Sequence, residues 1–262
     1  MSDEYAKLTG VNWSSLRHMA TSPLLYKWRL THPKEPTDEM IMGQAIHTAI
    51  LEPEEFSKRF AVFDGTRRGK VWDAWEEDHP GVESLKPKDL ANIDAVVNAV
   101  LSHPVAAAML EGGAFESPIT WTDPDTGFAC KARGDCFRPN RVVDLKSTSD
   151  ASPRAWSKKT ADMLHHGQFA FYHFGAIAAG RMPPDALSPV AIVVEQSEPY
   201  DVAVYAISDA ALFAGRALGI ELMNLLGACA DADYWPGVAP ELLTLDLPKW
   251  ARGVDSTAEV TV

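Results

Sequence analysis

The sequence has few cysteines, a shortage of basic residues and no long apolar run, and each shortage excludes a class of protein. Its three cysteines, Cys130, Cys136 and Cys229, form no CxxC pair, which argues against a disulfide framework and against a metal site built from cysteine alone. The 24 lysines and arginines face 36 acidic residues, giving a formal net charge of -12. Proteins that simply coat nucleic acid are usually basic, so this class is disfavoured, although an enzyme can still admit DNA through a locally basic passage.

Segments for membrane insertion, secretion and nucleotide binding are also missing. The longest apolar stretches, 169–179 and 190–194, are far shorter than the roughly 20 residues that span a bilayer. The N-terminus, Met1-Ser2-Asp3-Glu4, lacks the basic start and apolar run of a signal peptide. No glycine pattern of a phosphate-binding loop occurs, which speaks against intrinsic use of ATP. We therefore expect a cytoplasmic protein with no membrane partner.

What the sequence does have is the composition of a soluble globular chain, with 46% hydrophobic and 23% charged residues over 262 positions. Apolar periodicity predicts helices at about 12–29 (interrupted at Ser22-Pro23), 38–51, 88–110, 153–163, 166–179 and 208–226. Alternation and turn residues predict strands at 115–122, 128–137, 141–146, 190–195 and 202–207. This order predicts an α/β or α+β domain with a mixed central sheet, flanking helices and a helical N-terminal elaboration.

One short segment, residues 134–146, places acidic residues where two strands meet. A turn near Pro139-Asn140 with a symmetric loop of two or four residues pairs position 137 with 142, and therefore Asp135 with Asp144. Directly opposed residues of an antiparallel pair have Cβ atoms about 4.5–5.5 Å apart, and Lys146 projects from the same face as Asp144. Two carboxylates this close repel each other unless a proton or a cation lies between them, and such an oxygen-rich pocket suits Mg²⁺ or Mn²⁺. Because a lysine beside the metal can orient the attacking water, the pattern outlines a site for phosphodiester hydrolysis.

The alternative is that an Asp-x-Lys sequence occurs on a strand by chance, and that Asp144 and Lys146 form a surface ion pair. Taken alone, the two residues favour this alternative. With Asp135 in register and the apolar Val142-Val143 ahead of Asp144, the surface-pair and metal-site interpretations are about equally well supported.

Five short motifs occur in a fixed order along the chain. They are Gly43-Gln44-Ala45-Ile46-His47, Glu116-Ser117, Arg133-Gly134-Asp135, Asp144-Leu145-Lys146 and Gln168-Phe169-Ala170-Phe171-Tyr172. Together they resemble the PD-(D/E)XK nucleases of the RecE, RecB and lambda-exonuclease type. Trp13-Ser14-Ser15-Leu16 and Ser22-Pro23-Leu24-Leu25-Tyr26 are also similar to the RecE-like exonucleases of phages and prophages. Each motif is weak by itself, but five in the right order between about residues 10 and 235 are specific.

This resemblance implies a restriction-endonuclease-like core with a site for Mg²⁺ or Mn²⁺ and a role for each motif residue. The metal ligands would be His47, Asp135, Asp144 and the backbone carbonyl of Leu145. Lys146 would be the catalytic lysine, Glu116 a further acid near the metal-bound waters, and Gln168 and Tyr172 residues that reach the substrate backbone or brace the lysine. The second acid is Asp rather than the commoner Glu, which shifts the ligand geometry only.

Without the resemblance, these residues have ordinary structural interpretations. His47 would be a core or boundary histidine, Glu116 a strand-edge acid, and Gln168 and Tyr172 helix-packing residues. Arg133 either touches phosphate or merely neutralises the acids beside it.

A basic stretch before two tryptophans is a second candidate for DNA contact. Arg67, Arg68 and Lys70 would contact phosphates, and Trp72 with Trp75 would offer stacking surfaces, which suits a loop that grips DNA. The alternative, an exposed loop followed by a helix that uses its tryptophans for packing, is at least as good an interpretation.

The resemblance further implies a deoxyribonuclease that digests one strand of linear double-stranded DNA from an end in recombination. It also implies 5′→3′ polarity, a ring-shaped homo-oligomer, a single-strand annealing protein as partner, and a bacterial or phage-encoded system. We expect one nuclease domain over 1–240, with a helical part at about 10–110 and a catalytic core at about 113–230, and a C-terminal tail over 241–262. The competing functions are a helicase–nuclease domain, a CRISPR-associated iron–sulfur nuclease, an endonuclease and a catalytically idle DNA-binding module. The first two are weakened by the missing ATPase motor and four-cysteine cluster, and the last by the intact acid–acid–lysine set.

Overall fold

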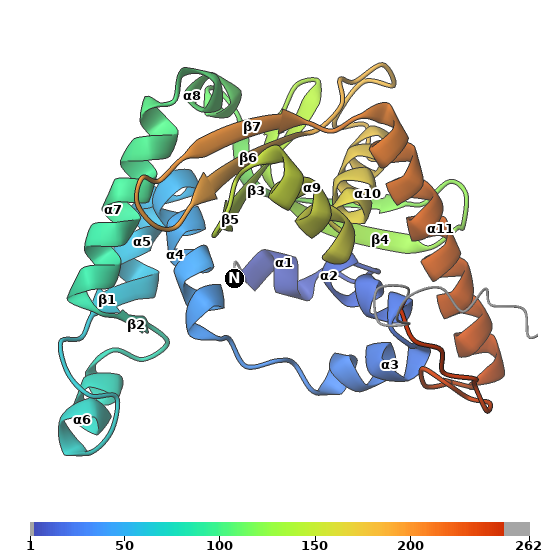
Figure 1. Ribbon diagram of the computed structural model, residues 1–262, viewed down its shortest axis with the longest axis horizontal. Helices are drawn as coiled ribbons and strands as arrows, with labels where there is room; N and C mark the ends of the chain where they lie inside the picture. Colours follow the sequence, from blue (N-terminus) through green and yellow to red (C-terminus); the bar gives the residue numbers. More distant parts are fainter. Residues whose placement is uncertain (1–2, 249–262) are drawn as a thin grey trace, which may run out of the picture.

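The computed structural model of the protein describes residues 3–248, and its centre is a five-stranded sheet (Figure 1). The strands lie in the order β3-β4-β5-β6-β7. Their bounds are β3 Ala114–Thr122, β4 Ala129–Arg138, β5 Arg141–Thr148, β6 Val190–Glu195 and β7 Val202–Ala206. All neighbours are antiparallel except β5 and β6, which are parallel. The predicted mixed sheet with flanking helices is confirmed, and each strand lies within two residues of its predicted bounds.

Two hairpin turns fix the register of the first three strands. In the β3–β4 turn the buried Asp123 carboxylate accepts the amide hydrogens of Asp125 and Thr126, and Gly127 takes the left-handed φ of 74° that the reversal requires. The β4–β5 connection is the two-residue loop Pro139-Asn140. Phe137 therefore pairs with Val142, which is the predicted register.

The two faces of the sheet pack against different helices. Val142 belongs to a core cluster that joins β3 and β4 to the helices α10 (His165–Ala178) and α11 (Asp209–Ala232). Val143 and Leu145 belong to a second cluster, with α4 (Asp38–Leu51) and α7 (Pro87–Ser102). Because side chains alternate along a strand, Asp144 and Lys146 project from the same face as Val142, as predicted.

The remaining helices build the N-terminal part and the edges. Their bounds are α1 Asp3–Lys7, α2 Trp13–Leu16, η1 Arg17–Ala20, α3 Pro23–Thr31, α5 Pro53–Arg59, α6 Lys70–Asp78, α8 Pro104–Leu110 and α9 Pro153–Asp162. Ser22 caps α3 through its hydroxyl and Ser208 caps α11 in the same way. In Figure 1, α6 lies at the lower left, away from the central sheet.

Besides the short helices α1 and α5, which were not predicted, three details of the fold differ from the sequence prediction. The single helix expected over 88–110 is two helices bent by 88°, because Pro104 has no amide hydrogen and His103 adopts an extended backbone. Helix α11 runs six residues past the predicted end at residue 226. The strands β1 (Phe60–Val62) and β2 (Glu83–Leu85) form a parallel pair that was not predicted, since three residues are too short to show a period.

Helix α11 is long and apolar enough to cross a membrane by length and composition, and the bent pair α7–α8 would also qualify as one span. In the fold, α11 packs along α10 so closely that a Cβ at Gly215 would lie 2.2 Å from the carbonyl oxygen of His166. Its residues Leu222, Met223 and Leu226 are buried in the core. Its apolar composition is accounted for by this packing.

The predicted tail over 241–262 lies only partly within the described residues. From residue 241 to residue 248 the chain has no helix or strand and is exposed. The rest of the predicted tail lies outside the described residues, and the domain boundary near 240 stays a prediction.

Candidate metal centre

Three carboxylates lie side by side on three neighbouring strands. The pairs Phe115–Cys136 and Ser117–Gly134 place Glu116 of β3 opposite Asp135 of β4. The pair Cys136–Val143 brings Asp135 next to Asp144 of β5. The sequence pattern indicated the second juxtaposition, whereas the first follows from the register across the longer β3–β4 turn at Asp123–Gly127, a register that was not predicted.

The strand pairing opens at this row of acids. The Asp135 carboxylate accepts the amide hydrogen of Leu145 with Oδ2 at 2.7 Å, in place of the backbone carbonyl that an uninterrupted ladder would supply. Glu116 has a φ of 47°, in the left-handed region that non-glycine residues rarely adopt. Such local strain persists where the surrounding structure holds it, and it is concentrated at functional sites.

His47 of helix α4 completes a group of three potential ligands with Glu116 and Asp135. Its Nδ1 is 3.6 Å from Asp135 Oδ2, and one ligand atom from each of the three residues lies within 4.8 Å of the other two. Burial, and then the charge of Lys146, lower the pKa of His47 to about 4, so its imidazole is neutral at pH 7 and keeps a lone pair for a metal. Within residues 3–248 this is the only such group of three.

Asp144 and Lys146 form the deeper half of the site. Asp144 is completely buried, and its Oδ2 makes an ion pair with the Lys146 ammonium. Its Oδ1 has no hydrogen-bond partner among the residues that the structure describes. A buried carboxylate oxygen without a donor is costly, and a bound cation would satisfy it. The donor set therefore fits a hard divalent ion: His47, Glu116 and Asp135 form the group of close ligand atoms, and Asp144, beside Asp135 on the neighbouring strand, lies outside that group.

Electrostatics in the site are dominated by burial and by repulsion between the acids. Burial, and then the neighbouring Asp135, raise the pKa of Glu116 to about 7, although Arg133 opposes the shift. Burial likewise raises the pKa values of Asp135 and Asp144. Burial alone would lower the pKa of Lys146, but the two aspartates outweigh it, and the pKa is raised. The acids therefore compete for too little positive charge, as expected for a cation site.

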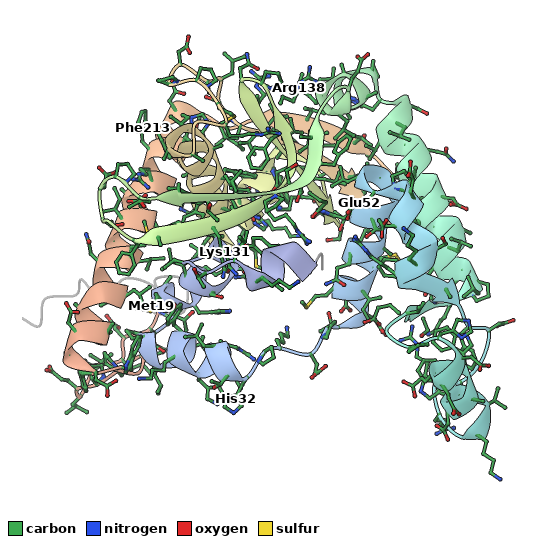
Figure 2. The ribbon with its side chains drawn as sticks, turned by 180° about the vertical axis from the view of Figure 1, so that it is seen from behind. Met19, His32, Glu52, Lys131, Arg138 and Phe213 are labelled. Carbon is green, nitrogen blue, oxygen red and sulfur yellow. The ribbon has the colours of Figure 1, made fainter. Side chains whose placement is uncertain are left out.

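A cavity of about 580 Å³ opens onto these ligands. It is lined by Met40, Gly43, Gln44, His47, Thr48, Glu52, Arg59, Phe60, Glu116, Arg133, Asp135 and Tyr172. Glu52 and Arg59, which the sequence interpretation missed, form a two-pronged ion pair of 2.7 and 3.1 Å in this wall. Figure 2 shows Glu52 at the end of α4, on the side of the helices that faces the sheet. The only sequence signal for this pair was its position directly after the His47 helix.

Gln168 and Tyr172 share one face of α10 beside the site. The Gln168 Nε2 donates a hydrogen bond of 3.2 Å to the Tyr172 hydroxyl, and Tyr172 reaches the cavity wall. Burial raises the pKa of Tyr172, and this effect outweighs the hydrogen bond from Gln168, which lowers it. The tyrosine therefore stays a neutral hydroxyl that can donate a hydrogen bond into the cavity.

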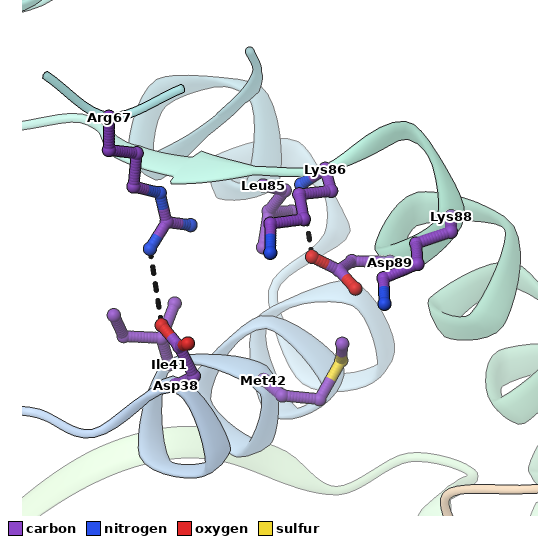
Figure 3. Close-up of a pocket in the computed structure, with 8 residues that line it drawn as sticks. All are labelled: Asp38, Ile41, Met42, Arg67, Leu85, Lys86, Lys88 and Asp89. Carbon is purple, nitrogen blue, oxygen red and sulfur yellow. Dashed lines mark hydrogen bonds and ion pairs between the residues drawn. The ribbon is translucent and has the colours of Figure 1, made fainter. Parts of the chain in front are cut away.

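Two residues of the basic stretch at residues 67–72, Arg67 and Trp72, make contacts within the fold. Arg67 pairs with Asp38 at 3.1 Å and donates to the carbonyl of Ser84 at 2.5 Å, as Figure 3 shows for the first of these contacts. Trp72 packs edge-on against Phe63 at 5.1 Å and stacks on Trp75 at 5.2 Å. Arg68 and Lys70 are exposed, and Lys70 begins helix α6. These contacts favour the packing interpretation of the tryptophans, and DNA contact here stays a prediction.

Comparisons with known proteins concern the family and the fold of the chain. The family model of the "PDDEXK-like domain of unknown function (DUF3799)" matches residues 13–242. The crystal structure of a "Putative exonuclease" from Eubacterium rectale superimposes with a TM-score of 0.64, at 12% identity, over 97% of this chain and 97% of that chain. At that identity the likeness shows the fold alone. The crystal structure of SSO0001 gives a TM-score of 0.26 at 15% identity, over 68% of this chain and 85% of that one, and carries no argument. No curated protein matches the sequence.

Proposed function

The chain belongs to the PDDEXK-like domain family, whose fold is that of PD-(D/E)XK nucleases, and we propose that it is a metal-dependent DNA exonuclease. The observation that carries the proposal is the row Glu116, Asp135 and Asp144 on adjacent strands, with the Lys146 ammonium on the last of them. This arrangement supports hydrolysis of a phosphodiester, because a bound ion and a lysine can activate water as the nucleophile. A serine, cysteine or threonine nucleophile is then not needed.

Each residue has a distinct task in this proposal. His47, Glu116, Asp135 and Asp144 would hold Mg²⁺ or Mn²⁺, and the ion would supply Lewis-acid stabilisation of the phosphate and a bound water of lowered pKa. The Leu145 carbonyl is a further ligand that the family resemblance implies. Lys146, fixed by its ion pair with Asp144, orients the attacking water and offsets charge that develops on the phosphate.

The walls of the site support an anionic substrate despite the overall charge of -12. Arg133 lines the cavity, and Tyr172 offers its hydroxyl to it. Gln168 braces Tyr172 through their hydrogen bond. These groups would contact the sugar-phosphate backbone rather than bases, so we expect little dependence on sequence.

The finer properties come from the family resemblance. They are digestion of one strand of double-stranded DNA from an end, 5′→3′ polarity, a ring-shaped oligomer, and cooperation with a single-strand annealing protein in recombination. The cellular compartment that we propose is the cytoplasm of a bacterial cell, whether the gene is bacterial or phage-derived.

Digestion of linear duplex DNA labelled at either the 5′ or the 3′ end tests the proposal. The expected result is release of labelled mononucleotide from the 5′ label first, in Mg²⁺ or Mn²⁺ but not in EDTA, and no nicking of a covalently closed circle. Cleavage of the circle would identify an endonuclease instead. Absence of any metal-dependent cleavage, with the protein folded, would leave the DNA-binding module as the better account.

A further inference from the structure

Arg133 lies in the cavity wall, and its positive charge is balanced by an ion pair with Glu116. Its Nε donates to Glu116 Oε2 at 2.8 Å, and its guanidinium lies 5.6 Å from the centre of the Tyr5 ring. The exposed fraction of its side chain is 25%, compared with 16% for Lys146 and 15% for Glu116. Among the residues that the structure describes, Glu116 is its only ion-pair partner.

The same Glu116 carboxylate is also a member of the ligand group with His47 and Asp135. It therefore has two competing uses, as a partner of a guanidinium and as a ligand of a divalent ion. A divalent cation attracts a carboxylate more strongly than a guanidinium does at equal distance, because the Coulomb energy scales with charge. Metal binding would therefore weaken the hold of Glu116 on Arg133.

The formal charges of the site point to what Arg133 would bind next. With all three acids ionised and no metal bound, the carboxylates of Glu116, Asp135 and Asp144 face the cations of Arg133 and Lys146, which leaves a net charge of minus one. One divalent ion turns this into plus one, which a single phosphodiester then neutralises. Arg133 is the more exposed of the two cations, and a guanidinium matches a phosphate with two parallel hydrogen bonds.

We propose that Arg133 is a metal-gated phosphate-binding residue: Glu116 holds it in the metal-free protein, and metal binding at Glu116 releases it to the phosphate of the substrate. The inference rests on the proposed function and adds an order to it, with metal before tight DNA binding. The neighbouring pair Arg59–Glu52 lines the same cavity but lies outside the ligand group, so it is a matched comparison.

The first test removes the Glu116 carboxylate that holds Arg133, in the absence of metal. DNA affinity is measured by fluorescence anisotropy of a short labelled duplex in EDTA, for wild type, Glu116→Gln and the control Glu52→Gln, which removes the same charge. Freeing one guanidinium for a charge-assisted phosphate contact should tighten binding by Glu116→Gln about tenfold. The control should stay near wild type, and adding Arg133→Gln to Glu116→Gln should cancel the gain. Equal affinities for Glu116→Gln and Glu52→Gln would overturn the proposal.

The second test follows the metal itself by calorimetry with Mn²⁺ and no DNA. Arg133→Gln removes the competitor for Glu116 and a nearby positive charge, so Mn²⁺ should bind about tenfold more tightly or better. The control Arg59→Gln should change the affinity much less. Unchanged or weaker Mn²⁺ binding by a folded Arg133→Gln protein would also overturn the proposal. If that variant does not melt cooperatively, the Glu116→Gln comparison decides.

A third arm separates this inference from the proposed function. In a Lys146→Gln background, which keeps a hydrogen-bond donor for Asp144 but stops turnover, Mn²⁺ should tighten DNA binding, and Arg133→Gln should remove that gain. Failure of the proposed function would appear as no Mn²⁺ binding and no DNA binding by the parent protein. Failure of the inference alone would appear as normal binding of both, with Arg133 and Arg59 variants behaving alike.

Discussion

The raised pKa of Glu116 predicts that the metal-free protein loses stability as the pH rises, and that Glu116→Gln removes this loss. In the unfolded chain the carboxyl ionises near 4.5, whereas in the fold burial and Asp135 hold its pKa at about 7. Between these values the folded state binds the extra proton, so stability falls with rising pH. The shift of 2.5, from 4.5 to about 7, corresponds to about 3 kcal/mol at 1.36 kcal/mol per unit.

Urea denaturation in EDTA at half-unit steps from pH 5 to pH 8 measures this effect as a difference between wild type and variant. Glu116→Gln should gain stability relative to wild type up to pH 7, by about 2–3 kcal/mol over the range, and level off above it. The lowered pKa of His47 gives the opposite slope, but it acts in both proteins and cancels in the difference. Saturating Mn²⁺ should reverse the order at pH 8, because the ion uses the ionised carboxylate.

The matched control is Glu52→Gln, which removes a carboxylate from the same cavity that is already paired with Arg59 at 2.7 Å. This variant measures what the loss of a paired carboxylate from the cavity does to stability at each pH, and the Glu116→Gln curve is compared with it. Parallel stability curves for wild type and Glu116→Gln would refute the reasoning, because they would show that the folded carboxyl ionises as it does in the unfolded chain.

Three further predictions concern the site and the helix packing around it. Lys146→Ala and Asp144→Asn should each lower the nuclease rate at least about 100-fold while circular dichroism stays native, and full activity in both would defeat the site assignment. Removal of metal should abolish cleavage, and Mn²⁺ at about 100 times its dissociation constant should raise the unfolding free energy by about 2.7 kcal/mol, so an unchanged melting temperature would count against the site. Gly215→Ala should destabilise the fold by about 1–3 kcal/mol, because its Cβ would lie 2.2 Å from the His166 carbonyl oxygen. The control Gly219→Ala, whose Cβ would have its nearest contact at 4.0 Å, should be neutral or stabilising. Equal urea midpoints for the two variants would contradict this packing.

Local patterns in the sequence were sufficient for the elements and for part of the site. The two-residue turn at Pro139-Asn140 fixed the register of β4 and β5, and therefore the meeting of Asp135 with Asp144. The two-residue side-chain period fixed the face of Lys146. Such features depend on neighbours along the chain, which is why they could be predicted. Pro104 marked a break in the same local way, but its apolar surroundings concealed it.

The motif order had named His47 and Glu116 as members of the site, but only the tertiary structure brings such distant residues to that pair. His47 comes from a helix about ninety positions earlier, Glu116 depends on the register of β3, and Arg133 could be seen as paired only once β3 and β4 were aligned. The same holds for Arg67 and Trp72, whose contacts with Asp38 and Phe63 cross the fold. Burial and repulsion between residues on separate strands are properties of three-dimensional packing, so the perturbed titration of this site appears in no sequence pattern.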